Sequence, residues 1–332
     1  MDYQDILVNL KKKIYHPVYF LMGEESYFIN QITDYISKNV LTDAEKSFNQ
    51  HVLYGKDTDV NTIITHARRF PMMANHQVVV VKEAQNIKKI EDLEAYIKAP
   101  LTSTILVINY KYKTIDKRKS FAKQLAKSCV LFESKKIYEN KLPAWINSYL
   151  SAHNYSIAPQ AAAMLAEYLG TDLSKVSNEL NKLIISLPEG TKIAPEHIEK
   201  NIGISKDYNI FELQNALSER NVLKSNQIIN YFAANPSSNP ITRTIASLYY
   251  YFMKILTLHF LTDKSPNAVA SALQVAPFFV RSYMDAAKVY NPKKLVAIME
   301  ILREYDMKSK GFGNVSTSAG DLQKEMIYKI LH

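Results

Sequence analysis

The turn at Gly23 is the first place where the residue types could indicate chemistry, because a short apolar run ends there and a helical pattern begins. A strand, a glycine and a helix in this order are where a nucleotide-binding domain carries its phosphate-binding loop. That loop needs a second glycine followed by Lys and Ser or Thr. Residues 22–27 instead read Met-Gly-Glu-Glu-Ser-Tyr, and the two carboxylates would repel a triphosphate. We therefore expect no ATP binding, and we place Glu24 and Glu25 in the first helical turn, where negative charge suits the helix dipole.

The other reactive residue types form no known catalytic or metal-binding pattern. The pair Gly55-Lys56 is followed by Asp57 and lacks the first glycine of a phosphate-binding loop. The eight histidines include no pair three or four residues apart, the spacing that puts two metal ligands on one face of a helix. Cys129 is the single cysteine, which excludes a disulfide framework and a four-cysteine metal site; we interpret it as a core residue in a buried strand. We predict no catalytic residue, no cofactor and no metal.

Composition indicates a globular protein with a basic surface. The chain has 332 residues, of which 47% are hydrophobic and 22% charged, and its net charge is +9. This length predicts two or three domains. The N-terminus is acidic where a signal peptide would be basic, and Lys254 and His259 interrupt the apolar run 249–261, so that it could not span a bilayer. We expect a soluble cytoplasmic protein with no membrane contact.

Hydrophobic periodicity divides the chain into an α/β part and a helical part. We predict strands at 17–22, 51–54, 77–81, 104–109 and 129–132, and helices at 24–39, 59–69, 90–98 and 116–128. Short strands that alternate with helices form a parallel sheet covered on both faces. After residue 138 we predict helices at 142–152, 159–169, 172–185, 195–201, 210–219, 222–234, 241–261, 266–273, 277–289, 292–308 and 321–331. The expected domains are 1–138, an α/β domain, followed by two all-α domains, 139–206 and 207–332.

Two features that suggest binding remain, and the first is an apolar connection between a predicted helix and a strand. It contains Phe70, Pro71, Met72 and Met73. The proline ends the helix and holds the following residues extended, so two flexible apolar side chains lie on a connection that runs over the surface. Paired methionines suit an adaptable binding surface. The alternative is that both methionines pack beneath the sheet.

The second feature is a basic stretch with tyrosines at positions 110 and 112. Its candidate DNA-contacting residues are Lys111, Lys113, Lys117, Arg118 and Lys119, followed by Lys123 and Lys127, with Asp116 as the single acid. Lysines at this density neutralise phosphates, and tyrosines stack on bases. A solvated helix face would have the same composition, so both interpretations stay open.

Short motifs spread over nearly the whole chain carry a family resemblance. They are residues 17–23 followed by 24–28, residues 70–73 ahead of 77–81, residues 170–173 with 178–183, residues 209–213, and residues 306–308. Each motif is short, but their order and spacing make the set fairly specific. Together with an α/β domain that lacks a phosphate-binding loop, they resemble the delta subunits of the bacterial DNA polymerase III clamp loader.

The resemblance implies a fold and a function without catalysis. Delta-like subunits have an AAA+-type α/β domain that cannot bind ATP, a small helical lid and a helical collar that assembles a pentamer. Such a subunit binds the sliding clamp and opens the ring, so that the clamp can be loaded on primer–template DNA during replication. It is not an enzyme by itself, although the DNA polymerase III holoenzyme as a whole is a nucleotidyltransferase. The implied partners are the sliding clamp, the ATPase and stator subunits, and DNA, in a cytoplasmic replisome associated with the nucleoid.

The resemblance also assigns the binding residues. In the family, two adjacent hydrophobic residues after the second main helix enter an apolar pocket on the clamp. Here these are Met72 and Met73, flanked by Phe70 and Pro71, whereas many relatives have Leu or Phe at the two positions. The basic stretch would face DNA inside the assembled complex.

Other functional classes make different demands on the sequence. An ATPase subunit of the loader needs a phosphate-binding loop, and both the ATPase and the stator subunits usually carry a four-cysteine zinc module, which one cysteine cannot form. A stand-alone DNA-binding regulator would use the basic stretch without a clamp, and another AAA+-derived scaffold or an enzyme with an unrecognised site would bind other ligands. Clamp binding, the salt dependence of DNA binding, and nucleotide or metal binding distinguish these classes.

Overall fold

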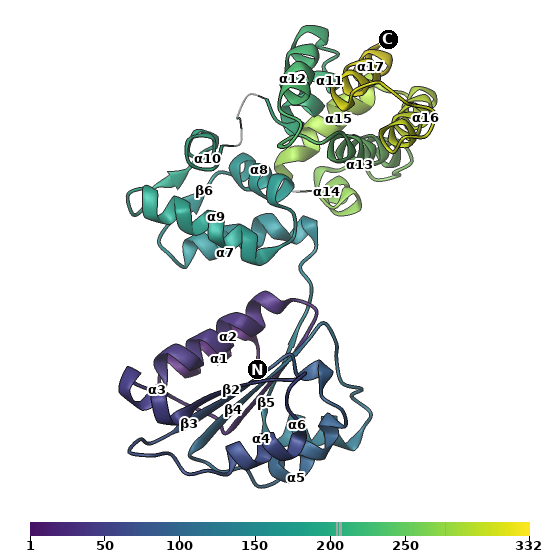
Figure 1. Ribbon diagram of the computed structural model, residues 1–332. Coiled ribbons are helices and arrows are strands. Elements are labelled where there is room, and N and C mark those ends of the chain that lie inside the picture. The colour runs from purple at the N-terminus through teal and green to yellow at the C-terminus, as the bar shows by residue number, and fades with distance from the viewer. Residues whose placement is uncertain (204, 206–207, 276) are drawn as a thin grey trace. The chain divides into compact units, whose positions relative to one another are not determined.

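A computed structural model describes residues 1–203, 205, 208–275 and 277–332 of the chain (Figure 1). The chain forms two compact units, Met1–Ile137 and Tyr138–His332, and we describe each by itself. The predicted boundary between residues 206 and 207 lies outside the described residues, so the further division into lid and collar stays a prediction.

The first unit is built on a parallel sheet of five strands in the order β2-β3-β4-β1-β5. The strands are β1 (Val18–Gly23), β2 (Gln50–Tyr54), β3 (Gln77–Lys82), β4 (Thr104–Lys111) and β5 (Val130–Ser134). All residues of β1, and all but the last of β3, are buried. Both faces of the sheet are therefore covered, which is why these strands read as continuous apolar runs. The predicted parallel α/β fold is confirmed.

Helices cover the sheet on both sides (Figure 1). They are α1 (Tyr3–Lys11), α2 (Ser26–Asn39), α3 (Asp43–Asn49), α4 (Val60–Ala67), α5 (Glu94–Ile97) and α6 (Ser120–Ser128). Residues of α1 and α2 pack on one face, against side chains such as Leu21 and Val80. Residues of α4, α5 and α6 pack on the other face, against neighbours such as Phe20 and Val81. Because side chains alternate along a strand, each strand contributes to both cores.

Several predicted elements of the first unit need correction. Helices α1 and α3 were not predicted; each is short and begins at a capping box, at Asp2 and Thr42. The predicted helix 90–98 is a 3-10 turn, Ile90–Leu93, followed by a single α-helical turn. Helix α2 begins at Ser26, so Glu24 and Glu25 precede its first turn, and the Glu25 carboxylate instead accepts a hydrogen bond from the Tyr27 N–H as the N-cap.

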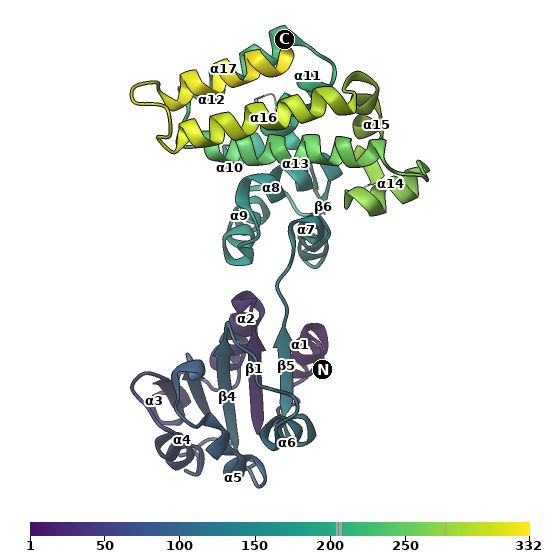
Figure 2. The same cartoon turned by 90° about the vertical axis from the view of Figure 1, so that its right-hand side faces the viewer.

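The second unit is helical, as predicted. Its helices are α7 (Leu142–Ser151), α8 (Pro159–Leu169), α9 (Leu173–Ser186), α10 (Pro195–Ile202), α11 (Ile210–Ser218), α12 (Val222–Ala234), α13 (Ile241–His259), α14 (Pro266–Leu273), α15 (Val280–Val289), α16 (Pro292–Ser309) and α17 (Ala319–Leu331). Helix α17 packs against α12 and α16, and α16 packs against α13 (Figure 2). Proline starts four of these helices, where its fixed φ and missing N–H cost nothing.

Two details of the second unit differ from the prediction. Ser156–Ile157 and Lys192–Ile193 form a small parallel ladder, β6 and β7, which is too short to leave a periodic signal. The predicted helix 277–289 is a 3-10 turn, Pro277–Phe279, followed by α15. Within the described ranges of the chain, the structure has no helix both long and apolar enough to cross a membrane.

Candidate functional site

The apolar segment between α4 and β3, residues 70–73, lies on the surface. Phe70 is 78% exposed, Met72 58% and Met73 97%. The surface position expected from Pro71 is confirmed, and packing of both methionines beneath the sheet is excluded. Met73 has φ +52°, a left-handed conformation that residues other than glycine rarely adopt.

Two buried amide side chains form hydrogen bonds with the backbone of this exposed segment and of the residue before it. The Gln77 Nε2 donates to the Arg69 carbonyl at 2.5 Å, directly before Phe70. The Met72 N–H donates to the Asn49 Oδ1 at 2.6 Å, and the Asn49 Nδ2 donates to the Met72 carbonyl at 2.9 Å. Gln77 and Asn49 are 1% and 2% exposed. The segment therefore combines exposed apolar side chains with a fixed backbone.

Two arginines directly precede this segment in the sequence. Arg68 and Arg69 follow α4 and are exposed. The rings of His51 and His66 lie 4.8 Å apart. Burial lowers the pKa of both histidines, and the charge of Arg69 lowers both further. The neutral form of both histidines is therefore favoured, and the exposed arginines carry positive charge here.

The five candidate DNA-contacting residues do not lie on one helix face. The predicted basic helix 116–128 begins only at Ser120, so its predicted first turn is wrong. Lys111 ends β4, and burial together with the charge of Lys82 lowers its pKa. Lys113 is exposed on the following loop. Lys117 pairs with Glu133 at 2.6 Å, and Arg118 pairs with Asp116 at 2.9 Å. Lys119 is the N-cap of α6, which begins only at Ser120.

The turn at Gly23 is closed by the protein's own backbone. The Gly23 N–H donates to the Lys113 carbonyl at 3.1 Å, the Tyr112 N–H donates to the Gly23 carbonyl at 2.8 Å, and the Glu24 N–H donates to the Ser134 carbonyl at 3.0 Å. In a phosphate-binding loop, backbone N–H groups at this position point at the ligand. Here the N–H groups of residues 23 and 24 already have protein acceptors.

The remaining reactive side chains considered are possible metal ligands and the Cys129 thiol. Among the described residues, the structure has no cluster of three His, Cys, Asp or Glu that could hold a metal. Cys129 is the half-buried C-cap of α6 and not part of the strand predicted there. Burial raises the pKa of its thiol to about 12, so little reactive thiolate exists at neutral pH.

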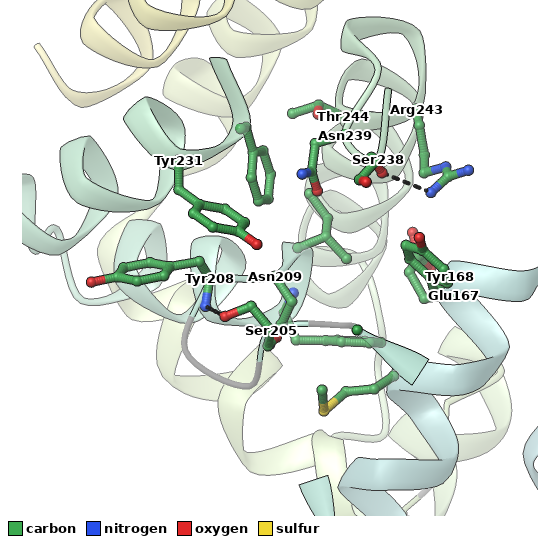
Figure 3. A pocket seen from close by; sticks show the side chains of 15 residues that line it. Glu167, Tyr168, Ser205, Tyr208, Asn209, Tyr231, Ser238, Asn239, Arg243 and Thr244 are labelled. Carbon is green, nitrogen blue, oxygen red and sulfur yellow. Dashed lines mark hydrogen bonds between the residues drawn. The ribbon is translucent and has the colours of Figure 1, made fainter. Parts of the chain in front are cut away.

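A small cavity in the second unit is lined by residues of α8, α12 and α13 and by residues near α11 (Figure 3). Its volume is about 50 Å³. Arg243 lies 5.4 Å from the Tyr168 ring and donates to the Ser238 carbonyl at 3.3 Å. A cavity of this size has room for a few water molecules.

Comparison with known proteins identifies the family. The family model described as DNA polymerase III, delta subunit matches residues 19–135, and a second model, for the C-terminal domain of the same family, matches residues 207–318. Together the two models cover more than half of the chain. The chain belongs to the DNA polymerase III delta subunit family. The predicted resemblance is confirmed, and a delta subunit is a component of the clamp loader in DNA replication.

Individual relatives agree with the delta family. The chain is 28% identical over 319 residues to DNA polymerase III subunit delta of Bacillus subtilis (strain 168), covering 92% of this chain and 91% of the relative. The solved structure of the Bacillus subtilis DNA clamp loader delta protein (YqeN) matches with a TM-score of 0.59 and 25% identity, over 99% of both chains. The RuvB Holliday junction branch migration motor of Thermotoga maritima also matches, at 13% identity over 86% of this chain and 85% of that chain, with a TM-score of 0.34.

The exposed segment 70–73 was predicted from the sequence, but the residues that hold it were not. Gln77 could have been noticed, because a polar residue that opens a run of four valines must satisfy its amide inside the core. Asn49 has no comparable signal, since it lies 23 residues from Met72 and was not in a predicted element. The bonds that close the turn at Gly23 likewise join residues far apart in sequence.

Proposed function

We propose that this chain is the clamp-loader subunit that binds the sliding clamp through Phe70, Pro71, Met72 and Met73 and opens the ring without hydrolysing ATP. Its partners are the clamp, the ATPase and stator subunits, and primer–template DNA. Residues 139–206 form the lid and residues 207–332 the collar. The observation that carries the proposal is the 97% exposure of Met73 on a fixed backbone, in a chain that belongs to the delta family.

Ring opening follows from differential binding. A closed ring in equilibrium with an open one shifts toward the open form only by the difference in the ligand's affinity for the two forms. Burial of two methionine side chains contributes roughly 1.5–3 kcal/mol each. This affinity suits a reversible contact, which the ATP-binding subunits could expose or cover. Arg68 and Arg69 beside the segment favour an acidic rim on the clamp.

The absence of ATP hydrolysis is supported by the turn at Gly23. It has neither the second glycine nor the lysine of a phosphate-binding loop. Its N–H groups are bonded to Lys113 and Ser134. Nucleotide binding there would require those backbone bonds to break, and two glutamates would then face the phosphates.

DNA contact is proposed for the loop between β4 and α6, mainly through Lys113 and Lys119. Lys111 is half-buried, and Lys117 and Arg118 are paired with carboxylates. A stand-alone regulator of DNA would need a larger unpaired cationic surface on this loop. The pairing therefore favours DNA contact within an assembled clamp loader over independent DNA binding.

The deciding experiment is clamp binding by the full chain. The purified protein and the sliding clamp of the same organism are mixed, and the complex is measured by native mass spectrometry and by titration. We expect one clamp protomer to be bound, and Met72→Ser with Met73→Ser to weaken binding at least about 100-fold. Ile185→Ser, which removes an 85% exposed apolar side chain from α9, is the matched control and should leave binding unchanged.

Circular dichroism of the double variant verifies that its fold is intact. Unchanged affinity in a folded double variant would show that the methionines are not the anchor. Failure of the unaltered protein to bind the clamp would contradict the proposed function itself.

A further inference from the structure

Asn49 lies at the junction of α3 and β2, and its whole side-chain amide is used. Its Oδ1 accepts from the Met72 N–H at 2.6 Å, while its Nδ2 donates to the carbonyls of Met72 at 2.9 Å and Glu45 at 3.1 Å. A flipped amide would oppose donor to donor and acceptor to acceptor. The bonding pattern therefore fixes both the amide and the backbone of Met72.

The backbone of the segment is held on both sides of its exposed side chains. Before them, the Gln77 amide binds the Arg69 carbonyl at 2.5 Å. After them, Ala74 packs against the core beneath α1 and α2. Between Asn49's contact at Met72 and the packed Ala74 stands only Met73, with φ +52° and 97% of its side chain exposed. The most exposed methionine thus projects from a loop that has little backbone freedom.

We propose that Asn49 is a positioning residue that holds the segment in its clamp-binding conformation without touching the clamp. This inference rests on the proposed function of residues 70–73. A loop that must become ordered on binding loses conformational entropy, and ordering one residue corresponds to about a tenfold change in an equilibrium constant. A segment that Asn49 already orders avoids this loss, so Asn49 raises affinity through pre-organisation.

The substitution Asn49→Asp tests, through pH, the hydrogen bonds that Asn49 donates. An aspartate has the shape of asparagine and still accepts from the Met72 N–H, but its ionised carboxylate has no proton for the carbonyls of Met72 and Glu45. Burial against two carbonyl oxygens raises the pKa of such a carboxyl. On protonation the carboxyl gains one O–H, which can donate to one of the two carbonyls. We expect clamp affinity about tenfold below that of the unaltered protein at about pH 8, with recovery toward it at about pH 5.

Two further variants serve as controls for this titration. Asn49→Ala removes all three hydrogen bonds of the amide and adds no charge, so its weaker binding should not recover in acid. Asn39→Asp makes the same chemical change at an exposed amide on α2, which bonds the Tyr35 carbonyl, and should bind normally. Titration of the unaltered protein at each pH measures the change in affinity that comes from ionisable groups of the clamp.

That same titration also accounts for the native ionisable groups on the elements that adjoin Asn49. These are Asp43, Glu45 and Lys46 on α3, His51 on β2, His66 and Arg69 at the end of α4, and His76 before β3.

Amide hydrogen exchange in the unbound protein gives a readout that does not depend on the clamp. We expect the Met72 amide to be protected in the unaltered protein and exposed in Asn49→Ala, while the amides of β3 stay protected in both. Loss of protection across β3 would instead report unfolding of the unit. Equal protection of Met72 in the two proteins would overturn the inference.

The outcomes separate this inference from the proposed function. If Met72→Ser with Met73→Ser abolishes clamp binding but Asn49→Asp binds normally at about pH 8, the positioning role is wrong and the anchor stands. If the unaltered protein binds no clamp, the proposed function fails, and the positioning role in clamp binding fails with it. In that case hydrogen exchange at Met72 still decides whether Asn49 orders the segment.

Discussion

Gly23 ends β1, between β4 and β5 in the sheet, at a position that no other residue type fits. Its φ is +123°, and a Cβ built there would lie 2.0 Å from the Ser134 carbonyl oxygen. The backbone bonds of residues 23 and 24 to Lys113 and Ser134 depend on this close approach. The glycine that would open a phosphate-binding loop therefore serves, in this chain, to join β1, β5 and the loop after β4.

Gly23→Ala should destabilise the first unit strongly. We expect a loss of about 2–4 kcal/mol in the free energy of unfolding, since the methyl group meets backbone atoms that cannot move without breaking the sheet. Gly190→Ala is the control, because it shares a positive φ but has no atom within 4 Å of the added Cβ. Its backbone strain alone should cost about 1 kcal/mol. Denaturant unfolding measures both, and equal losses would contradict this account of Gly23.

The loop between β4 and α6 shows how local bonds decide where an element begins. The Asp116 carboxylate accepts from both the N–H and the guanidinium of Arg118. A side chain that bonds nearby backbone groups competes with helix formation. Helix α6 therefore starts at Ser120, and the basic residues before it lie on a loop with different degrees of burial and pairing.

Pairing of these charges predicts unequal contributions to DNA binding. We expect Lys113→Ala with Lys119→Ala to reduce the slope of log affinity against log salt by about 1–2, as for the loss of one or two phosphate contacts. Lys117→Ala with Arg118→Ala should change the slope less, because Glu133 and Asp116 already neutralise these two cations. DNA titrations at several salt concentrations measure the slopes. A larger effect of the second pair would contradict the assignment.

On the scale of the whole molecule, a short connection joins the two units. Residues 135–138 have no regular secondary structure, and Lys135 and Lys136 are exposed. All residues of the proposed anchor, together with Asn49 and Gln77, belong to the unit Met1–Ile137. The proposed clamp-binding function thus lies in one unit.

Limited trypsin digestion of the full chain should cut first at Lys135 or Lys136, because proteases prefer exposed segments without secondary structure between compact units. We expect two stable fragments by mass spectrometry, and the N-terminal fragment should remain bound to the clamp. Early cleavage within β3 or β4 would contradict the division into units. Clamp binding only by the C-terminal fragment would contradict the location of the anchor.

Much of the fold could be predicted from the sequence, because hydrophobic periodicity and the residues that begin or end helices and strands are local signals. The strand at 77–81 and the helix at 59–69 were predicted directly, whereas Pro71 favoured a surface connection but left packing of Met72 and Met73 beneath the sheet open. Prediction failed where elements are short, as in α3 and the 3-10 turn at 90–93, and it also missed the nine-residue helix α1. A few residues carry too little periodicity to distinguish a helix from a loop.

The chain by itself determined the sheet, the helices, the lack of a phosphate-binding loop and the apolar pair on its connection. Tertiary structure alone decided that Asn49 meets Met72 and that Gly23 meets Ser134. It also decided which cations are paired with distant acids, as in Lys117 with Glu133. Periodicity reflects neighbours a few residues apart, whereas these contacts join segments 16 or more residues apart, which come together only when the two faces of the sheet are buried.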